Sequence, residues 1–201
     1  MMEGKKGEAM NPMPTREAAW KLLTENVPSD GLQRHALSVE AVMRHMARRA
    51  GADEEAWGLV GMCHDIDYEK YPEQHCVKAR EILEAAGWPE ELIRAVVSHG
   101  WGICSDVEPI SLLEKTLFAI DELTGLVTAA ALVRPSRSVL DLPVKSVRKK
   151  WKDKAFAAGV DRGVIEKGAA MLGVDLDELT GHVIDGMRPV AEAIGLKGNV
   201  E

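Results

Sequence analysis

Five side chains that bind metals or transfer protons stand at positions where helices end or turn an apolar face inward. They are His35, His64, Asp65, His99 and Asp121. Neighbouring residues of a regular helix point about 100° apart, so His64 and Asp65 can reach one point only where their helix ends. Neutral imidazoles and carboxylates together bind zinc, manganese or iron. The pattern therefore predicts a metal site with open positions for water and substrate.

Each of these side chains also has a purely structural interpretation. A single histidine on an apolar helix face, such as His35, usually makes one hydrogen bond in a core or interface. His99 can interact with a helix dipole, and Asp65 can cap or turn the chain. Asp121 is harder to explain in this way, because a carboxylate in an apolar stripe costs several kcal/mol unless it is paired or binds a metal. Only the joint pattern favours a metal site.

The segments that would position these side chains all carry helix signals. Prolines and capping residues mark their beginnings, glycines and prolines mark their ends, and strand-like alternation is absent. The helices that we expect cover residues 15–27, 31–51, 54–65, 73–87, 90–100, 109–133, 146–159, 161–173 and 175–195. The predicted fold class is therefore all-α.

A break in composition at residues 134–145 suggests how the chain is organised. This stretch, "RPSRSVLDLPVK", holds two prolines and few helix signals. We expect three parts, which are a flexible leader at 1–13, a helical core at 14–133 and a C-terminal helical cap at 134–201 that packs on the core.

The composition restricts the class of protein. Of 201 residues, 46% are hydrophobic and 28% are charged, which is typical of a globular chain. The net charge of 25 − 32 = −7 disfavours a nucleic-acid polymer as partner. No apolar run approaches the roughly 20 residues of a membrane span, and the N-terminal stretch lacks a signal-peptide core, so we expect a cytoplasmic protein. The three cysteines, without a CxxC pair, indicate free thiols.

The order His35, His64-Asp65, His99, Asp121 resembles the ligand order of the HD-domain superfamily of metal-dependent phosphohydrolases. The neighbouring sequences "RHALSVEAVM", "HDIDYEKYPEQH", "IRAVVSHG" and "AIDELTGLV" fit as well. The resemblance covers residues 30 to 133 and implies an HD-domain helical core with a C-terminal helical extension. The segment 134–162 is similar to the tail of a small, poorly characterised bacterial subgroup of predicted HD hydrolases.

The resemblance also implies a ligand set. The residues that it assigns to a first metal ion are His35, His64, Asp65 and Asp121. Asp65 would bridge to a second ion, and His75 and His99 fall where two-metal members keep further histidines. The alternative for His75 is a surface residue on an amphipathic helix. We expect one or two divalent transition metal ions (Fe, Mn or Zn), with a di-iron pair as one form.

The reaction that the resemblance implies is hydrolysis of a phosphate ester, because a bound metal lowers the pKa of coordinated water towards about 7. Asp65 and Asp67 are the candidate catalytic residues. Asp67 is either a base or orienting group beside the metal or an exposed loop acid. Glu122, next to Asp121, is expected on the surface.

A phosphate substrate also needs positive charge near the site. The candidate substrate-binding residues are Lys70, Arg134 and Lys149, of which the last two lie in a locally basic segment of an acidic protein. The alternative for that segment is a solvated helix face.

These observations together predict a metal-dependent phosphohydrolase, either a phosphomonoesterase or a phosphodiesterase. Its substrate would be a small phosphorylated metabolite, with nucleotides as the first guess. The alternatives are a di-iron HD-type oxygenase and a non-catalytic metal- or ligand-binding regulatory module. The oligomeric state stays open, with a homodimer as one option, and a membrane is not an expected partner.

Overall fold

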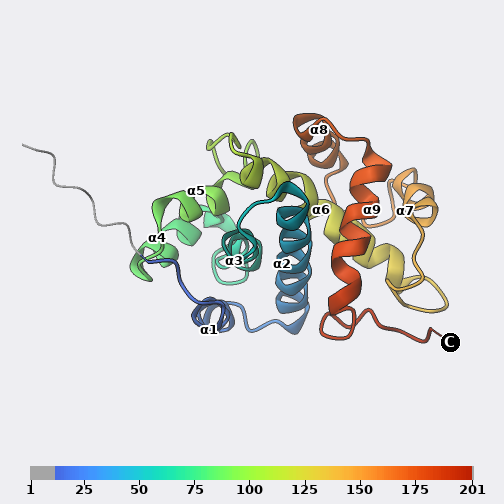
Figure 1. The fold of residues 1–201 in the computed structure, drawn as a ribbon, viewed down its shortest axis with the longest axis horizontal. Coiled ribbons are helices and arrows are strands. Elements are labelled where there is room, and N and C mark those ends of the chain that lie inside the picture. The colour runs from blue at the N-terminus through green and yellow to red at the C-terminus, as the bar shows by residue number, and fades with distance from the viewer. Residues whose placement is uncertain (1–11, 201) are drawn as a thin grey trace, which may run out of the picture.

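The structure is a computed structural model that describes residues 12–200, so most of the leader expected at residues 1–13 lies outside the described residues (Figure 1). In chain order its helices are α1 (Arg16–Asn26), α2 (Asp30–Ala50), α3 (Glu54–Cys63), the 3-10 turn η1 (Pro72–Gln74), α4 (Val77–Ala85), α5 (Glu90–Ser98), α6 (Leu112–Leu132), α7 (Val144–Trp151), α8 (Arg162–Leu172), α9 (Leu176–Met187) and the 3-10 turn η2 (Arg188–Val190). The described part contains no strand, which confirms the all-α prediction. Within it, every helix is too short or too polar to cross a bilayer.

Helix α2 is the centre of the fold. It packs against α3 on one side and against α6 and α9 on the other (Figure 1). Val39, Val42 and Met43 are fully buried along its inner face, at the spacing of one helical stripe. Burial of each such side chain contributes about 1.5–3 kcal/mol. This packing holds α2 and α6 close together, and both helices carry expected ligands.

The remaining N-terminal helices close the other side of this core. Helix α1 lies on α3, and α4 lies on α5, which in turn contacts α3 and α6. Helices α3 and α5 therefore end inside the core, at His64 and His99 respectively. The fold brings both helix ends next to α2 and α6.

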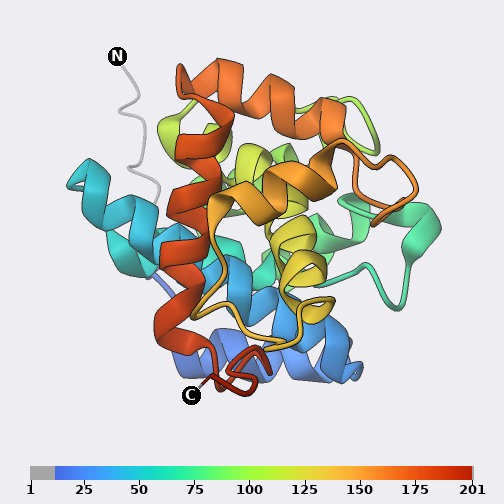
Figure 2. The same ribbon diagram turned by 90° about the vertical axis from the view of Figure 1, so that its right-hand side faces the viewer.

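The C-terminal helices pack on this core. Helix α8 packs against α6, and α9 packs against α2 (Figure 2). Helix α7 contacts both α9 and α6. Gly168 of α8 permits the closest approach, because a Cβ there would lie 2.4 Å from the Cα of Ala119. Gly186 of α9 has a similar role against Val42, at 2.8 Å from its Cα. Two glycines thus allow the C-terminal helices to dock directly on backbone.

The helix expected at 73–87 begins later than the sequence indicated. Helix α4 begins only at Val77, and His75 lies in the preceding turn rather than in a helix. Cys76 has a φ of 67°, which breaks the helical path that the residues after Pro72 could have continued. The buried Asp67 carboxylate accepts a hydrogen bond from the Ala79 amide in the first turn of α4. The turn at Cys76 and the hydrogen bond from Ala79 to Asp67 together direct the side chain of His75 towards the core.

Three other expected helices are shorter than predicted. The helix expected at 175–195 ends at Met187 as α9, and residues 188–195 form the 3-10 turn η2 and further turns. Helix α6 begins at Leu112 and not at residue 109, because Ser111 and Glu114 form a capping box there. Helix α7 ends at Trp151, and residues 152–159 form turns instead of the expected helix. The Asp153 side chain accepts from the Ala155 and Phe156 amides, and such local bonds compete with a helix.

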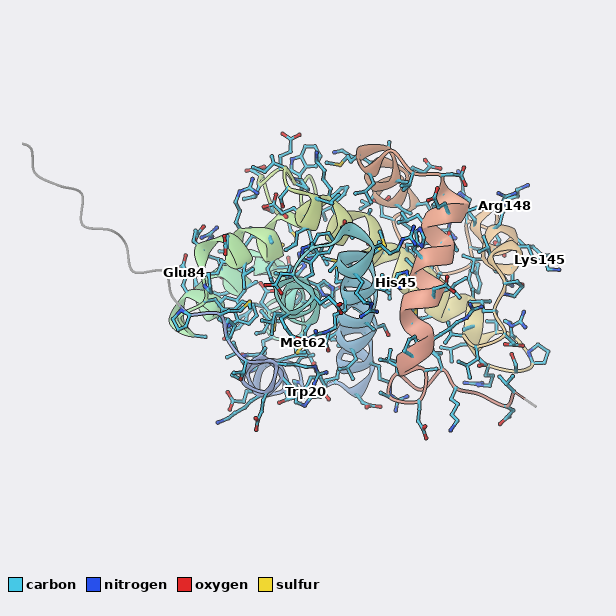
Figure 3. The ribbon with its side chains drawn as sticks, viewed as in Figure 1. Trp20, His45, Met62, Glu84, Lys145 and Arg148 are labelled. Atoms are coloured by element: carbon cyan, nitrogen blue, oxygen red, sulfur yellow. The ribbon has the colours of Figure 1, made fainter. Side chains whose placement is uncertain are left out.

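One histidine pair lies where α9 docks on α2. The ring of His45 on α2, which is labelled in Figure 3, lies next to the ring of His182 on α9, with a centroid distance of 5.7 Å. Burial, followed by the nearby His182, lowers the pKa of His45. The stability that neutral His45 contributes is therefore complete above its unfolded pKa of about 6.5 and is lost as pH falls below that towards the folded pKa.

We expect the melting temperature of the wild type to fall between about pH 8 and about pH 5, and to fall less in His45→Gln, which cannot take up this proton. Thermal melts of both proteins across that range test the difference. Equal slopes would show that His45 does not contribute.

Candidate metal centre

The six expected ligands come together in the structure from five different segments. They are His35 on α2, His64 and Asp65 at the end of α3, His75 in the turn before α4, His99 at the end of α5 and Asp121 on α6. They form two groups, each with ligand atoms within 4.8 Å of one another. The first group is His35, His64 and Asp121, and the second is Asp65, His75 and His99.

Asp65 lies between the two groups. Its Oδ2 is 3.3 Å from Nε2 of His64, in the first group. Its Oδ1 is 3.4 Å from Nε2 of His75 and 3.5 Å from Nε2 of His99, in the second group. One carboxylate therefore presents a different oxygen to each group, which is the geometry that a bridge between two ions requires.

Hydrogen bonds behind the rings fix which nitrogen of each histidine points into the site. Nδ1 of His64 lies 2.8 Å from the Gly61 carbonyl, and Nδ1 of His99 is bonded to the Val96 carbonyl. A carbonyl oxygen only accepts, so both Nδ1 atoms donate a hydrogen. In the neutral rings the lone pair is then on Nε2, which faces the carboxylates.

These lone pairs need a positive partner. Nε2 of His64 is buried and has no hydrogen-bond partner within the described residues. Nε2 of His75 and Nε2 of His99 are 3.1 Å apart, and two lone pairs at that distance repel unless a proton or a cation lies between them. The arrangement fits divalent transition metals, whose usual ligands are imidazole nitrogens and carboxylates.

The pKa values of the cluster agree with this fit. Burial alone would lower the pKa of His64, but Asp65 and Asp121 raise it well above its usual value. Burial would likewise raise the pKa of Asp121, yet His64 and His35 hold it well below its usual range. Without a metal, protons thus balance the buried carboxylates. Metal binding is expected to displace those protons, since ligand histidines must be neutral.

Asp67 lies directly behind this cluster and not within it. Its carboxylate is fully buried, with Oδ1 2.7 Å from Nδ1 of His75 and Oδ2 2.7 Å from the Ala79 amide. Both oxygens are occupied and neither faces the cavity, so the geometry does not support the expected base role. The geometry supports the orienting role, in which Asp67 directs the ring of His75. Because Asp67 is buried, it is not the exposed loop acid of the alternative expectation.

Asp67→Asn is expected to weaken metal binding at the second group by about 10–100-fold, because loss of such a supporting partner has that effect in other metal sites. The first group should keep its affinity. Calorimetric titration of metal-free protein would resolve the two binding steps. An equal loss in both steps would instead indicate general unfolding.

The ligands open into a cavity of about 360 Å³. His35, Asp65, His75, His99 and Asp121 form its polar wall. The largest apolar residues that line it are Leu32, Tyr68, Ile103, Phe118 and Val164. Gly159 and Val164 come from the C-terminal segment, which therefore supplies part of the cavity wall.

Glu122 lines the same cavity, so the expectation that it lies on the surface is wrong. The C-terminal segment covers this side of α6, and the Asp161 amide donates to Oε2 of Glu122 at 3.3 Å. Burial, and then the charge of Asp121, raises the pKa of Glu122 to about 7. The angle between neighbouring residues of a helix directs Glu122 away from Asp121, and nothing in the sequence indicates that the segment around Asp161 covers this side of α6.

The three basic residues expected to bind substrate lie elsewhere. Lys70 donates to the Glu25 carbonyl and the Asn26 side chain, at the end of α1. Arg134 donates to Asp141, and Lys149 is exposed on α7. None of the three lines the cavity.

The basic segment as a whole lies on the outside of the C-terminal helices. Lys145 and Arg148, two further basic residues of α7, lie at the edge of the molecule opposite α4 (Figure 3). Arg148 pairs with Asp177 of α9. The solvated helix face is thus the better interpretation of this segment.

The fold and this site define an all-α protein with an imidazole- and carboxylate-rich centre in its helical core. Residues 32–126 match the family model of the HD domain, which supports placing this segment in the HD-domain superfamily. HD domains are in general metal-dependent hydrolases that bind divalent metals. No curated protein and no solved structure matches the chain. The match contains all six expected ligands.

Proposed function

We propose that the protein is a metal-dependent phosphohydrolase with a two-metal centre, acting on a small phosphorylated metabolite. The observation that carries the proposal is Asp65, whose two oxygens face two separate groups of ligands. In this assignment His35, His64 and Asp121 hold one ion, His75 and His99 hold the other, and Asp65 bridges them. When bound, such ions activate water and neutralise phosphoryl charge.

The protein's own residues position this centre. The Gly61 and Val96 carbonyls hold the rings of His64 and His99, and Asp67 holds that of His75. These contacts fix the orientation of three rings before any ligand arrives, so metal binding requires loss of protons but little movement of the side chains.

The cavity also indicates the size and type of substrate. A volume of about 360 Å³ suits a small molecule and is too small for a polymer to enter. Tyr68 provides an exposed aromatic surface beside the metal groups. Aromatic surfaces stack on planar rings, and we therefore propose a phosphate ester with a planar or apolar part, such as a nucleotide.

The test is phosphate release by metal-free protein reconstituted with Mn²⁺, Fe²⁺ or Zn²⁺, measured on a panel of phosphomonoesters and phosphodiesters that includes nucleotides. We expect hydrolysis of at least one small ester with at least one metal. His182→Gln, a histidine change outside the centre, is the matched control and should retain full activity.

Two results would overturn the proposal. Protein that binds two ions but hydrolyses no member of the panel would favour a binding module. Iron-loaded protein that consumes oxygen without releasing phosphate would instead favour the oxygenase alternative.

A further inference from the structure

We propose that Cys76 and Cys104, together with His75, form a separate site for a thiophilic divalent ion such as zinc or cadmium. The ligand atoms of these three residues lie within 4.8 Å of one another. The two thiols are free, and their Sγ atoms are 3.1 Å apart. Two thiolates and an imidazole are the ligands that zinc and cadmium prefer over carboxylates.

Several features of the fold bring the two sulfur atoms together. Both lie over Gly100, where a Cβ would be 2.3 Å from Sγ of Cys104 and 2.5 Å from Sγ of Cys76. Gly100 follows His99 directly, so the thiol pair adjoins the second metal group. Any residue other than glycine at position 100 would push the sulfur atoms apart.

The backbone on both sides of the pair is also defined. The Gly100 carbonyl accepts hydrogen bonds from the amides of Ile103, Cys104 and Ser105, which fixes the loop that carries Cys104. Cys76 has a φ of 67°, a conformation that glycine adopts more easily. The residue at that strained position is nevertheless a cysteine, which is buried and whose Sγ contacts Sγ of Cys104.

This site differs from the two-metal centre in its ligands, but it shares His75 with it. Each thiol would release its proton to solvent when the ion binds. Because His75 cannot serve both ions at once, a thiophilic ion would remove one ligand from the second group. That competition rests on the function proposed above, whereas binding by the two thiols does not.

The test is titration of metal-free protein with Cd²⁺ under a phosphine reductant and without oxygen, followed by the near-ultraviolet absorption of cadmium–thiolate bonds. We expect one ion per chain with a sulfur signal in the wild type. Cys76→Ser and Cys104→Ser should each weaken binding by at least about 100-fold, since removing a direct ligand exceeds the 10–100-fold effect of a supporting partner. Cys63→Ala, at the buried cysteine far from this pair, is the matched control and should bind as the wild type.

Cadmium NMR of the wild-type protein gives a second readout that does not depend on any variant folding. A resonance without thiolate ligation, or retention of thiolate absorption in both serine variants, would overturn the site.

Manganese counting separates this proposal from the phosphohydrolase proposal. Cadmium-loaded wild type should bind one Mn²⁺ fewer than cadmium-free protein, while His35→Ala, which alters only the first group, should keep the cadmium–sulfur signal. Loss of that signal in His35→Ala would overturn the independence of the thiol site. Absence of hydrolysis with an intact sulfur signal would count against the phosphohydrolase alone.

Discussion

Asp65→Ala is expected to reduce both metal binding and hydrolysis strongly. The wild type should hold about two ions per chain and the variant fewer than about one, because the lost carboxylate is the only group that faces both ligand sets among the described residues. Hydrolysis should fall by at least about 100-fold, more than a supporting partner contributes. Metal analysis and phosphate release on the same preparations measure both effects.

The matched control for this prediction is Asp106→Ala, which removes a carboxylate that does not line the cavity. It should keep both ions and full activity. If Asp65→Ala kept two ions and lost only activity, Asp65 would act on the substrate and not as a bridge. If it kept one ion and most of its activity, a single-metal phosphohydrolase would remain.

Gly168→Ala is expected to destabilise the protein more than any other small substitution in the C-terminal helices. The new Cβ would lie 2.4 Å from the Cα and 2.6 Å from the Cβ of Ala119 on α6. Backbone cannot move aside as a flexible side chain does, so the cost should reach the upper part of the overpacking range, about 2–3 kcal/mol. For a chain of this size, that corresponds to a melting temperature lower by about 5–10 °C.

Gly181→Ala provides the comparison for this variant. Gly181 lies in α9, and the nearest atom to its new Cβ is Val144 Cγ2 at 3.8 Å, an ordinary contact. This substitution should raise the melting temperature by about 2–4 °C through helix propensity. Equal melting temperatures for the two variants would contradict the close docking of α8 on α6.

Five of the six candidate ligands could be selected from the sequence because they stand at helix ends or on apolar stripes, whereas His75 was implied only by the resemblance to the HD-domain superfamily. Gly51, Pro89 and the capping residues mark where the helices begin and end. The prediction that His64 and Asp65 meet at the end of their helix needed only helical geometry. Local rules of this kind do not depend on how distant segments pack.

The other parts of the site depend on tertiary contacts that local patterns do not record. Glu122 was misplaced because only the distant Asp161 segment turns its side of α6 into a cavity wall. Arg134 was expected to bind the substrate because of its positive charge, but in the structure its guanidinium group donates a hydrogen bond to Asp141. For the thiol pair, the sequence does contain a hint of proximity to the candidate metal centre. Cys76 directly follows His75, and Cys104 lies five residues after His99.

The cavity wall has a consequence for the order in which ligands arrive. The described residues that line it include five of the candidate ligands and Glu122, but no lysine or arginine. Metal-free protein should therefore attract a phosphate ester only weakly, because the protons on its histidines do no more than balance the buried carboxylates. Substrate affinity itself, and not turnover alone, would then follow the supply of free metal. In this way the protein would respond to the metal status of its surroundings before it responded to substrate.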